Sequence, residues 1–350
     1  MPVLFLMRIS AWCVARVPTP LSRLPKAVNR AMGAIIAPVA GAALLSAWGA
    51  CGRERSTGEQ TAQEALIIRV PTDSSAEPKP LYTYVVNREV TVKDYFETMD
   101  RLVCWLDSFT PYPLTEHLLV HANPWIIDTL AETDYYRRLA RGEFVFDQRQ
   151  LLVLRPGHLL HLPDTAEARR LQQRIDSLWL DLNIPEFRLR VVCGSDTLFQ
   201  VPVRVGQNKR RFQQIPGRVE DLRTRTGRGR IIRVNRTPTF FVDPHTGRRL
   251  HTTRRDDGQR TRMPLIPWIE TEINGVRNGQ MLHPTTNPAS LNKASSNGCI
   301  GYSEADAWRV YYHAPVGTPI VIRYDLDVPL PQGDTLHLRD IYGRRRTRKR

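Results

Sequence analysis

The sequence predicts an α+β protein in which a mainly helical region is followed by a mostly β region. Three observations support this. Apolar residues recur at helical spacing across residues 87–179. From Pro185 onward, short apolar runs closed by Gly, Pro, Asn and Asp replace that pattern, which is typical of strands. The chain has 350 residues, 41% hydrophobic and 24% charged, so its composition is that of a globular protein with room for two domains.

Residues 1–50 are predicted to form an export signal or a membrane anchor. Basic side chains precede the apolar run MGAIIAPVAGAALLSAWGAC, which ends in small residues and Cys51. This order is that of a secretory signal, and the run is about as long as a bilayer requires. Three outcomes stay open: lipidation of Cys51, as in a bacterial lipoprotein; a conventional cleaved signal peptide; or an uncleaved anchor. Each predicts a location in the cell envelope, on the periplasmic side and tethered to the membrane.

Residues 51–86 are predicted to be a flexible tether. The stretches GRERSTGEQTAQEA and PTDSSAEPKP are polar, rich in Ser and Pro, and lack hydrophobic periodicity. Such a segment would hold the folded part away from a membrane surface.

The net charge of +15 belongs mainly to the two ends of the chain. Residues 1–50 hold basic side chains without an acid, and the last seven residues are RRRTRKR. The region between them has only a mild basic excess, with no aromatic-rich basic groove or known motif. Nucleic acid is therefore not expected as a partner.

Residues 87–179 contain three predicted helical stretches. These are VTVKDYFETMDRLVCWLDSF, a stretch broken near Pro124, and EARRLQQRIDSLWLDL. His117 and His121 are four residues apart, a spacing that can suit a metal. Since no third ligand stands out nearby, we interpret both as ordinary helix residues and expect no metal. LLVLRPGHLLHLPD, near residues 151–163, predicts a hairpin that distantly resembles the closing part of LysM glycan-binding modules.

The second region is predicted to be mostly β with one helix. FRLRVVCGSDTLFQVPVRVG predicts two strands around a turn at Gly194, and GRIIRVNRTPTFFVDPHTGRRL, PLIPWIETEING and GTPIVIRYDLDV continue the pattern. The single helix follows Cys299 in the sequence SEADAWRVYYH. We place the domain boundary near residue 180.

Cys299 is the best candidate for a reactive side chain. It lies in SSNGCIGYSEADAW, among small and polar residues, whereas Cys104 and Cys193 lie in apolar elements whose spacing implies no disulfide. A thiol needs help to react near neutral pH, because the thiolate is the nucleophile. The help usually comes from a histidine close in space. His283, in MLHPTTNPASL, lies sixteen positions upstream, which leaves enough chain for a loop to bring the two together.

Several motifs in sequence order resemble the L,D-transpeptidase catalytic domain of the YkuD family. They are IPEFRLRVV, VPVRVG, His283 with Thr285 two residues later, SNGCIGYSEADAWRVY and VGTPIVIRY. The resemblance covers residues 180–326, with residues 327–350 left as a C-terminal extension that ends in the basic tail. It implies a β-sandwich-like catalytic domain, peptidoglycan stem peptides as substrate, and no cofactor.

The resemblance also implies residue roles. Cys299 would attack the carbonyl of the third residue of a tetrapeptide stem and expel the terminal D-Ala, giving a thioester that an amine on another stem then takes. His283 would hold the thiolate and shuttle the proton, oriented by the main-chain carbonyl of Pro284. Backbone N–H groups around Gly298 and Cys299 would face the developing oxyanion.

The sequence departs from the family pattern at three positions. Pro284 replaces a glycine, Asn297 replaces the second histidine, and Gly301 stands where the family usually has Arg or Asn. The last departure puts substrate anchoring in doubt more than chemistry; Lys293, Arg309 or another base would have to supply the charge. The substrate-binding candidates implied by the motif are Ser296, Asn297, Thr285 and Gly301.

The predicted function is peptidoglycan L,D-transpeptidation in cell-wall biosynthesis and the maintenance of cell shape. One alternative keeps the same Cys–His chemistry but uses water as acceptor, or attaches or releases a wall protein. The alternative from another class is a non-catalytic cell-wall binding protein, whose departures at the motif record decay of the site.

Overall fold

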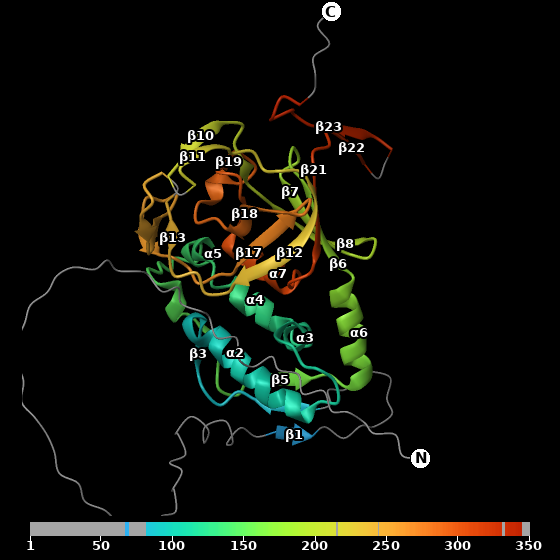
Figure 1. Ribbon diagram of the computed structural model, residues 1–350. Helices are drawn as coiled ribbons and strands as arrows, with labels where there is room; N and C mark the ends of the chain where they lie inside the picture. Colours follow the sequence, from blue (N-terminus) through green and yellow to red (C-terminus); the bar gives the residue numbers. More distant parts are fainter. Residues whose placement is uncertain (1–66, 70–81, 215, 244, 331–332, 345–350) are drawn as a thin grey trace, which may run out of the picture. The chain divides into compact units, whose positions relative to one another are not determined.

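The computed structural model describes residues 67–69, 82–214, 216–243, 245–330 and 333–344 (Figure 1). The predicted signal or anchor, Cys51, most of the predicted tether and the tail beyond Arg344 lie outside the described residues. Within the described ranges, no helix combines the length and the hydropathy needed to cross a membrane.

The first region is mainly helical, as predicted. Some of its helices begin after capping residues: the side chain of Asp134 accepts hydrogen bonds from Tyr136 N and Arg137 N, and that of Asp164 accepts one from Glu167 N. The α-helices are α2 (Val92–Leu106), α3 (Glu116–His121), α4 (Trp125–Ala131), α5 (Tyr135–Leu139) and α6 (Thr165–Asp176), with 3₁₀ turns η1 (Asp107–Phe109) and η2 (Gln148–Gln150).

The predicted last helix of this region is too long. Helix α6 ends at Asp176, and Leu178–Asn183 form strand β6 instead. This strand lies between two neighbours in the sheet, and five of its six residues are buried. A strand that is covered on both faces shows no clear alternation of exposed and buried residues, so its sequence cannot be distinguished from a buried helix by periodicity.

The predicted hairpin near residues 151–163 does not form. Both apolar runs are strands, β4 (Leu152–Leu154) and β5 (Leu159–Leu162), but they pair with different partners. Strand β4 pairs with β3 (Val90–Thr91), and β5 pairs with β2 (Tyr82–Val85). Strand β2 in turn pairs with β1 (Ile67–Arg69), so two stretches of the predicted tether form strands.

The second region is built on an eight-stranded sheet in the order β20-β18-β17-β12-β21-β6-β7-β8. Two neighbouring pairs, β18/β20 and β21/β6, are parallel, and the others are antiparallel. The remaining bounds are β7 (Arg188–Cys193), β8 (Asp196–Pro202), β12 (Gly227–Asn235), β17 (Trp268–Ile273), β18 (Val276–Pro284), β20 (Ile300–Tyr302) and β21 (Pro319–Arg323).

Short two-stranded pairings surround this sheet. Strands β9 (Val205–Gly206) and β19 (Ala294–Ser296) are parallel. The hairpins are β10–β11 (Arg210–Gln213, Arg218–Asp221), β13–β14 (Phe241–Val242, Arg249–Leu250), β15–β16 (Thr252–Arg254, Arg260–Arg262) and β22–β23 (Asp327–Pro329, Thr335–His337). The predicted mostly β region is therefore confirmed.

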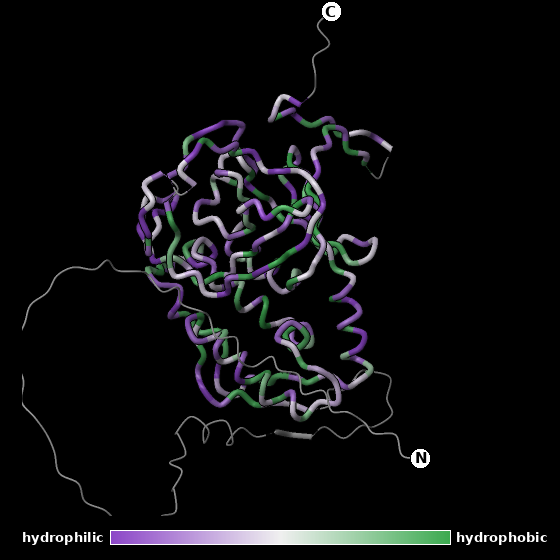
Figure 2. The backbone as a smooth tube through the Cα atoms, viewed as in Figure 1, coloured by the Kyte–Doolittle hydropathy of each residue, from purple (hydrophilic) through white to green (hydrophobic). Residues whose placement is uncertain are grey.

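Helix α7 (Glu304–Tyr312) is the predicted single helix after Cys299. The side chain of Ser303 caps its N-terminus by accepting from Asp306 N. Trp308 is fully buried and packs against the Tyr95 and Phe96 rings of α2. Apolar residues of both regions belong to one hydrophobic cluster, and the hydrophobic stretches of these elements can be followed in Figure 2.

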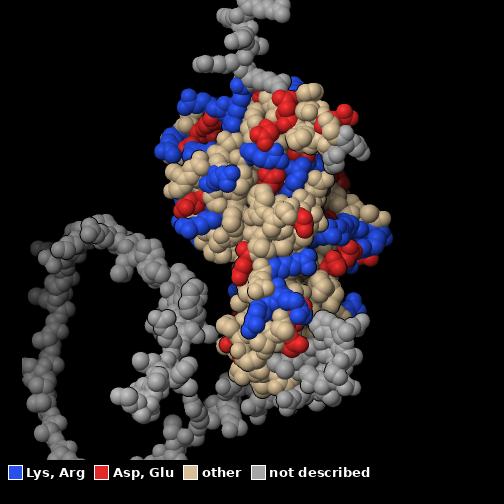
Figure 3. Space-filling model, turned by 90° about the vertical axis from the view of Figure 1, so that its right-hand side faces the viewer, with Lys and Arg blue, Asp and Glu red and all other residues tan. Residues whose placement is uncertain are grey.

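Charged side chains of both signs lie among uncharged ones on the face drawn in Figure 3. Figure 3 shows Lys and Arg interspersed with Asp and Glu on the face turned to the viewer. Several form ion pairs, such as the half-buried Glu116 with Arg236, which also binds Asp100.

The two histidines of helix α3 satisfy the C-terminal carbonyls of α7. His117 Nε2 lies 3.2 Å from Tyr311 O, and His121 Nε2 lies 2.7 Å from Tyr312 O. These carbonyls belong to the last turn, where a helix has no internal donors. The described residues contain no cluster of His, Cys, Asp and Glu that could hold a metal ion. The contacts of His117 and His121 with the carbonyls of α7 support the interpretation of both histidines as structural.

We expect His117→Gln to remove part of the acid sensitivity of folding. Burial lowers the pKa of His117 from 6.5 to about 4, because a buried imidazole resists protonation. Between these pH values the unfolded chain takes the proton first, so His117 makes the free energy of unfolding fall as pH falls. Glutamine keeps an N–H donor but does not titrate. Denaturant unfolding at pH 7 and pH 4.5 should give a smaller loss of stability for the variant; an equal loss would contradict this assignment.

Candidate active site

Parallel pairing of β18 with β20 brings His283 and Cys299 onto adjoining strands. In this register Leu282 faces Ile300 and His283 faces Gly301. Cys299 immediately precedes β20, and its sulfur accepts a hydrogen bond from Met281 N at 3.4 Å. The intervening loop must return the chain to the same edge of the sheet, because parallel strands need a crossover connection. The register therefore places Cys299 and His283 at neighbouring positions on the same edge of the sheet.

The ring of His283 is fixed in one tautomer. Its Nδ1 lies 2.8 Å from the carbonyl oxygen of Pro284, as the resemblance implied. A carbonyl only accepts, so Nδ1 must carry the proton, which leaves Nε2 as a base. Trp268, on β17, lies against the ring with centroids 5.1 Å apart. Burial, reinforced by the charge of Arg204, lowers the pKa of His283 to about 4.

The thiol of Cys299 is half-buried and protonated at neutral pH. Burial raises its pKa, while the Met281 N–H and the charge of Arg204 act in the opposite direction. Because the pKa of His283 is low and that of Cys299 is high, the resting pair is a neutral imidazole and a thiol. Reaction therefore requires a proton to leave sulfur as the nucleophile attacks, and Nε2 is the base available on the adjoining strand.

The three residues before Cys299 form a tight turn. Gly298 has φ +110°, and a Cβ there would lie 2.7 Å from Gln280 Nε2, so two constraints favour glycine. Its N–H donates to Ser296 Oγ at 3.2 Å, and Ser296 Oγ donates to Cys299 O at 2.6 Å. To stabilise an oxyanion, the Gly298 N–H would have to give up its bond to Ser296 Oγ and donate to the substrate oxygen instead. Asn297 Oδ1 accepts from Gln207 Nε2 at 3.2 Å.

Thr285 shapes the loop that follows His283. Its side chain is buried, its N–H donates to Tyr302 O at 2.7 Å, and its hydroxyl accepts from Asn287 N at 3.2 Å. These contacts fix the chain between β18 and the 3₁₀ turn η3 (Pro288–Ser290). A buried group engaged in this way is poorly placed to bind substrate, so the predicted binding role of Thr285 has no support in this geometry.

The helical region helps to hold the same loop. The hydroxyl of Tyr136, on α5, donates to Thr286 O at 3.2 Å and accepts from Asp256 N at 2.7 Å. The Asp256 carboxylate accepts from Ala289 N at 2.6 Å. These bonds connect α5, the β15–β16 hairpin and the His283 loop.

Gly301 lies under the side chain of Arg204, which precedes β9. A Cβ at Gly301 would lie 2.6 Å from Arg204 Nε. Of the two bases named from the sequence, Lys293 is exposed, and the Arg309 guanidinium lies over the Phe199 ring at 5.9 Å. Arg204 is therefore the basic side chain in contact with this position.

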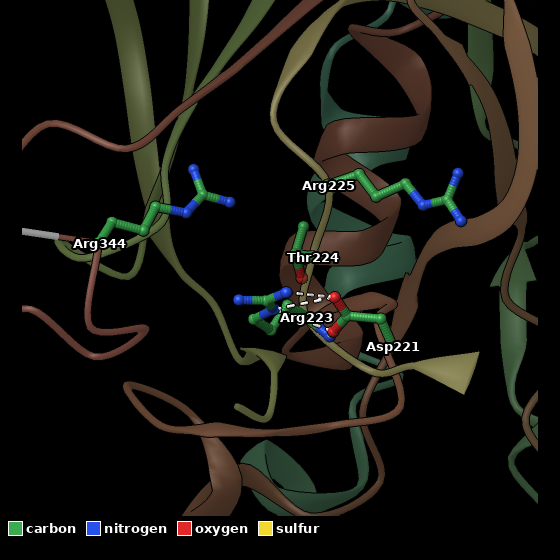
Figure 4. Close-up of a pocket in the computed structure, with 5 residues that line it drawn as sticks. All are labelled: Asp221, Arg223, Thr224, Arg225 and Arg344. Atoms are coloured by element: carbon green, nitrogen blue, oxygen red, sulfur yellow. Dashed lines mark hydrogen bonds and ion pairs between the residues drawn. The ribbon is translucent and has the colours of Figure 1, made fainter. Parts of the chain in front are cut away.

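A pocket of about 380 Å³ adjoins the turn before Cys299 (Figure 4). Thr224 connects the pocket to this turn, because its hydroxyl donates to Gly298 O at 2.9 Å and accepts from Gly206 N at 2.8 Å. The lining residues are Asp221, Arg223, Thr224, Arg225 and Arg344; Arg223 is paired with Asp221. The lining is thus net basic, with Arg225 and Arg344 contributed by separate segments.

The C-terminal extension contributes to this wall. Tyr342 is buried, its hydroxyl donates to Gly206 O at 2.6 Å, and the same hydroxyl accepts from Thr224 N at 3.1 Å. Arg344 lies over the Tyr324 ring at 4.5 Å.

Sequence reasoning missed four residues of this site: Arg204, Thr224, Trp268 and Gln280. Gln280 bridges by donating to Arg223 O at 2.9 Å and accepting from Arg225 N at 2.9 Å. None of the four lies in the cysteine motif, and each comes to the site through sheet pairing or a loop. Only Arg204 carried a signal, since VPVRVG was already one of the motifs that resemble the family.

Residues 177–322 match the family model of the YkuD L,D-transpeptidase catalytic domain. No curated protein matches the chain.

Among solved structures, an L,D-transpeptidase from Mycobacterium smegmatis is 18% identical, with a TM-score of 0.29, and the match covers 42% of this chain and 58% of that one. The catalytic domain of an E. faecium L,D-transpeptidase is 12% identical, with a TM-score of 0.27 and coverage of 42% and 96%. An L,D-transpeptidase from Xylanimonas cellulosilytica is 13% identical, with a TM-score of 0.29 and coverage of 71% and 100%.

Similarities this low support no functional conclusion by themselves, and the chain spans 58% of the length of the M. smegmatis protein. The family model is more specific, because its match contains both His283 and Cys299. It identifies residues 177–322 as the part of this chain that matches the YkuD family of L,D-transpeptidase catalytic domains.

Proposed function

We propose that this protein is a cysteine-dependent L,D-transpeptidase that acts on peptidoglycan stem peptides. One observation carries the proposal: His283 lies one strand from Cys299, with Nδ1 bonded to Pro284 O and Nε2 left as a base. That is the arrangement needed to activate a thiol that is protonated at rest.

The proposed reaction has two stages. Nε2 of His283 takes the thiol proton as the sulfur of Cys299 attacks the carbonyl carbon of the third stem residue. The bond to the terminal D-Ala breaks, the imidazolium returns its proton to the leaving amine, and a thioester remains on Cys299. An amine of a second stem then attacks the thioester, gives its proton to Nε2, and releases the thiol.

The basic pocket beside the turn fits an acidic substrate. Stem peptides carry carboxylates, and the guanidinium groups of Arg225 and Arg344 suit carboxylate recognition. The layout of residues 1–50 supports a site of action in the cell envelope, at the periplasmic face and tethered to the membrane through Cys51 or an anchor.

The experiment is incubation of the described part of the chain with tetrapeptide muropeptides, with products read by mass. Transpeptidation predicts loss of D-Ala together with a cross-linked dimer. Loss of D-Ala without a dimer identifies water as the acceptor and supports the carboxypeptidase alternative. Binding without any change in mass would contradict an enzyme and favour the cell-wall binding protein.

A further inference from the structure

We propose that Arg204 takes the place of the basic residue that is missing at position 301 and acts as a positioning residue for Cys299 and His283. The inference rests on the proposed function for its role in turnover. Its structural part, the influence of Arg204 on the thiol, can be tested without any substrate.

The first observation is that Gly301 and Arg204 occupy one space. A Cβ at Gly301 would lie 2.6 Å from Arg204 Nε, 2.9 Å from its Cγ and 3.2 Å from its Cδ. Even alanine at position 301 would therefore displace the guanidinium stem. Because position 301 is a glycine, the side chain of Arg204 can lie against the backbone there. The basic residue that the family usually has at position 301 is then replaced by Arg204, and its absence from that position is not a sign of a decayed site.

The second observation is that the backbone fixes this crossing. Arg204 N donates to Gly301 O at 2.8 Å, and Gly301 N donates to Arg204 O at 3.1 Å. This reciprocal pair anchors the base of the arginine side chain beside Gly301, two residues from Cys299. Gly301 in turn faces His283 in the pairing of β18 with β20. The anchor does not depend on the side chain, so its substitution should leave the local backbone in place.

The third observation concerns charge. Arg204 forms no ion pair with any described carboxylate, and its buried Nε has no hydrogen-bond partner among the described residues. The carboxylate of Asp256 acts on Arg204 from beyond ion-pair distance and offsets part of its charge. Because no carboxylate is paired with the guanidinium, the remaining charge still acts on its neighbours in a poorly hydrated site. It lowers the pKa of the Cys299 thiol and also lowers the pKa of His283. Arg204 thus favours a thiolate and keeps the imidazole neutral, so that Nε2 can accept a proton.

The test measures alkylation of Cys299 by iodoacetamide across pH, followed on the Cys299 peptide by mass, with the exposed Cys104 as internal reference. Arg204→Met keeps the length of the side chain without charge and should shift the Cys299 profile upward by about 1 pH unit. Arg204→Lys should largely restore the profile. Arg309→Met, which removes an arginine that lies over Phe199, is the matched control and should leave the profile unchanged.

A charge-relocation cycle makes the test specific. Gly301→Arg alone should lose most D-Ala release, because the new side chain meets Arg204, and Arg204→Ala alone should also lose it. The double variant, R204A with G301R, should recover activity above both single variants, which a purely structural role would not produce.

An unchanged alkylation profile in Arg204→Met, in a protein whose thermal melt is normal, would overturn the inference. So would a double variant no better than its parents. If the profile shifts while the unmodified protein releases no D-Ala, the influence of Arg204 on the thiol stands and the proposed function fails.

Discussion

Cys299→Ser should lose essentially all release of D-Ala from a tetrapeptide stem, by about 10⁴-fold or more, while the fold persists. A serine hydroxyl is a far poorer nucleophile than a thiolate, and the low pKa of His283 makes that imidazole too weak a base for a hydroxyl. The substitution is nearly isosteric, so the thermal melt should stay close to that of the unmodified protein.

His283→Ala should cost about 10²–10⁴-fold, the usual contribution of a positioned acid–base group. Asn297→Ala is the matched control within the same loop, because its side chain accepts one hydrogen bond from Gln207 and does not carry the proton. Losing such a contact costs about 1–3 kcal/mol, roughly a five- to 150-fold effect. If Asn297→Ala abolished turnover while His283→Ala left it intact, the assignment of the base would be wrong.

Glu304→Ala should lower the free energy of unfolding by about 3–5 kcal/mol. Glu304 and Arg255 form an ion pair whose side chains are 1% and 0% exposed. The carboxylate also accepts from Tyr135 N at 3.0 Å and Gln148 Nε2 at 2.7 Å. Removing it leaves the Arg255 guanidinium charged, buried and without its counterion, which is the costly way to break such a pair.

The matched control is an exposed pair. Glu132 and Arg137 are 46% and 42% exposed, so Glu132→Ala should change stability by about 1 kcal/mol or less. Chemical denaturation of both variants measures the difference. Because Glu304 begins α7 and Arg255 follows β15, Glu304→Ala should also loosen the His283 loop and reduce turnover. Equal stability of the two variants would contradict a structural role for the buried pair.

The elements with a strong local signal were predictable from sequence. The helix over SEADAWRVYYH was predicted directly after the run of small and polar residues around Cys299, and the β7–β8 hairpin was predicted from its turn at Gly194. Strand β6 was not predictable, because its burial on both faces is decided by tertiary contacts. Nor was the separation of β4 from β5, because tertiary contacts also decide which strand each one pairs with.

The site divides in the same way. Cys299 and His283 were proposed from the sequence because one motif order contains both, and the bond from His283 to Pro284 O joins adjacent residues. Arg204 lies 97 positions before Gly301 in the sequence, and only strand pairing brings the two together. Spacing within the cysteine motif carries no information about a residue so far away in the sequence. The absence of a basic residue at position 301 therefore did not point to Arg204.

The most direct test of the central claim is the intact mass of the protein after brief exposure to a tetrapeptide stem, quenched in acid, with the adduct then located by digestion. We predict a mass increase equal to the tripeptide acyl group, lying on the peptide that contains Cys299 and absent in Cys299→Ser. In His283→Ala the same adduct should form much more slowly. An adduct on another residue, or release of D-Ala without dependence on Cys299, would contradict the account.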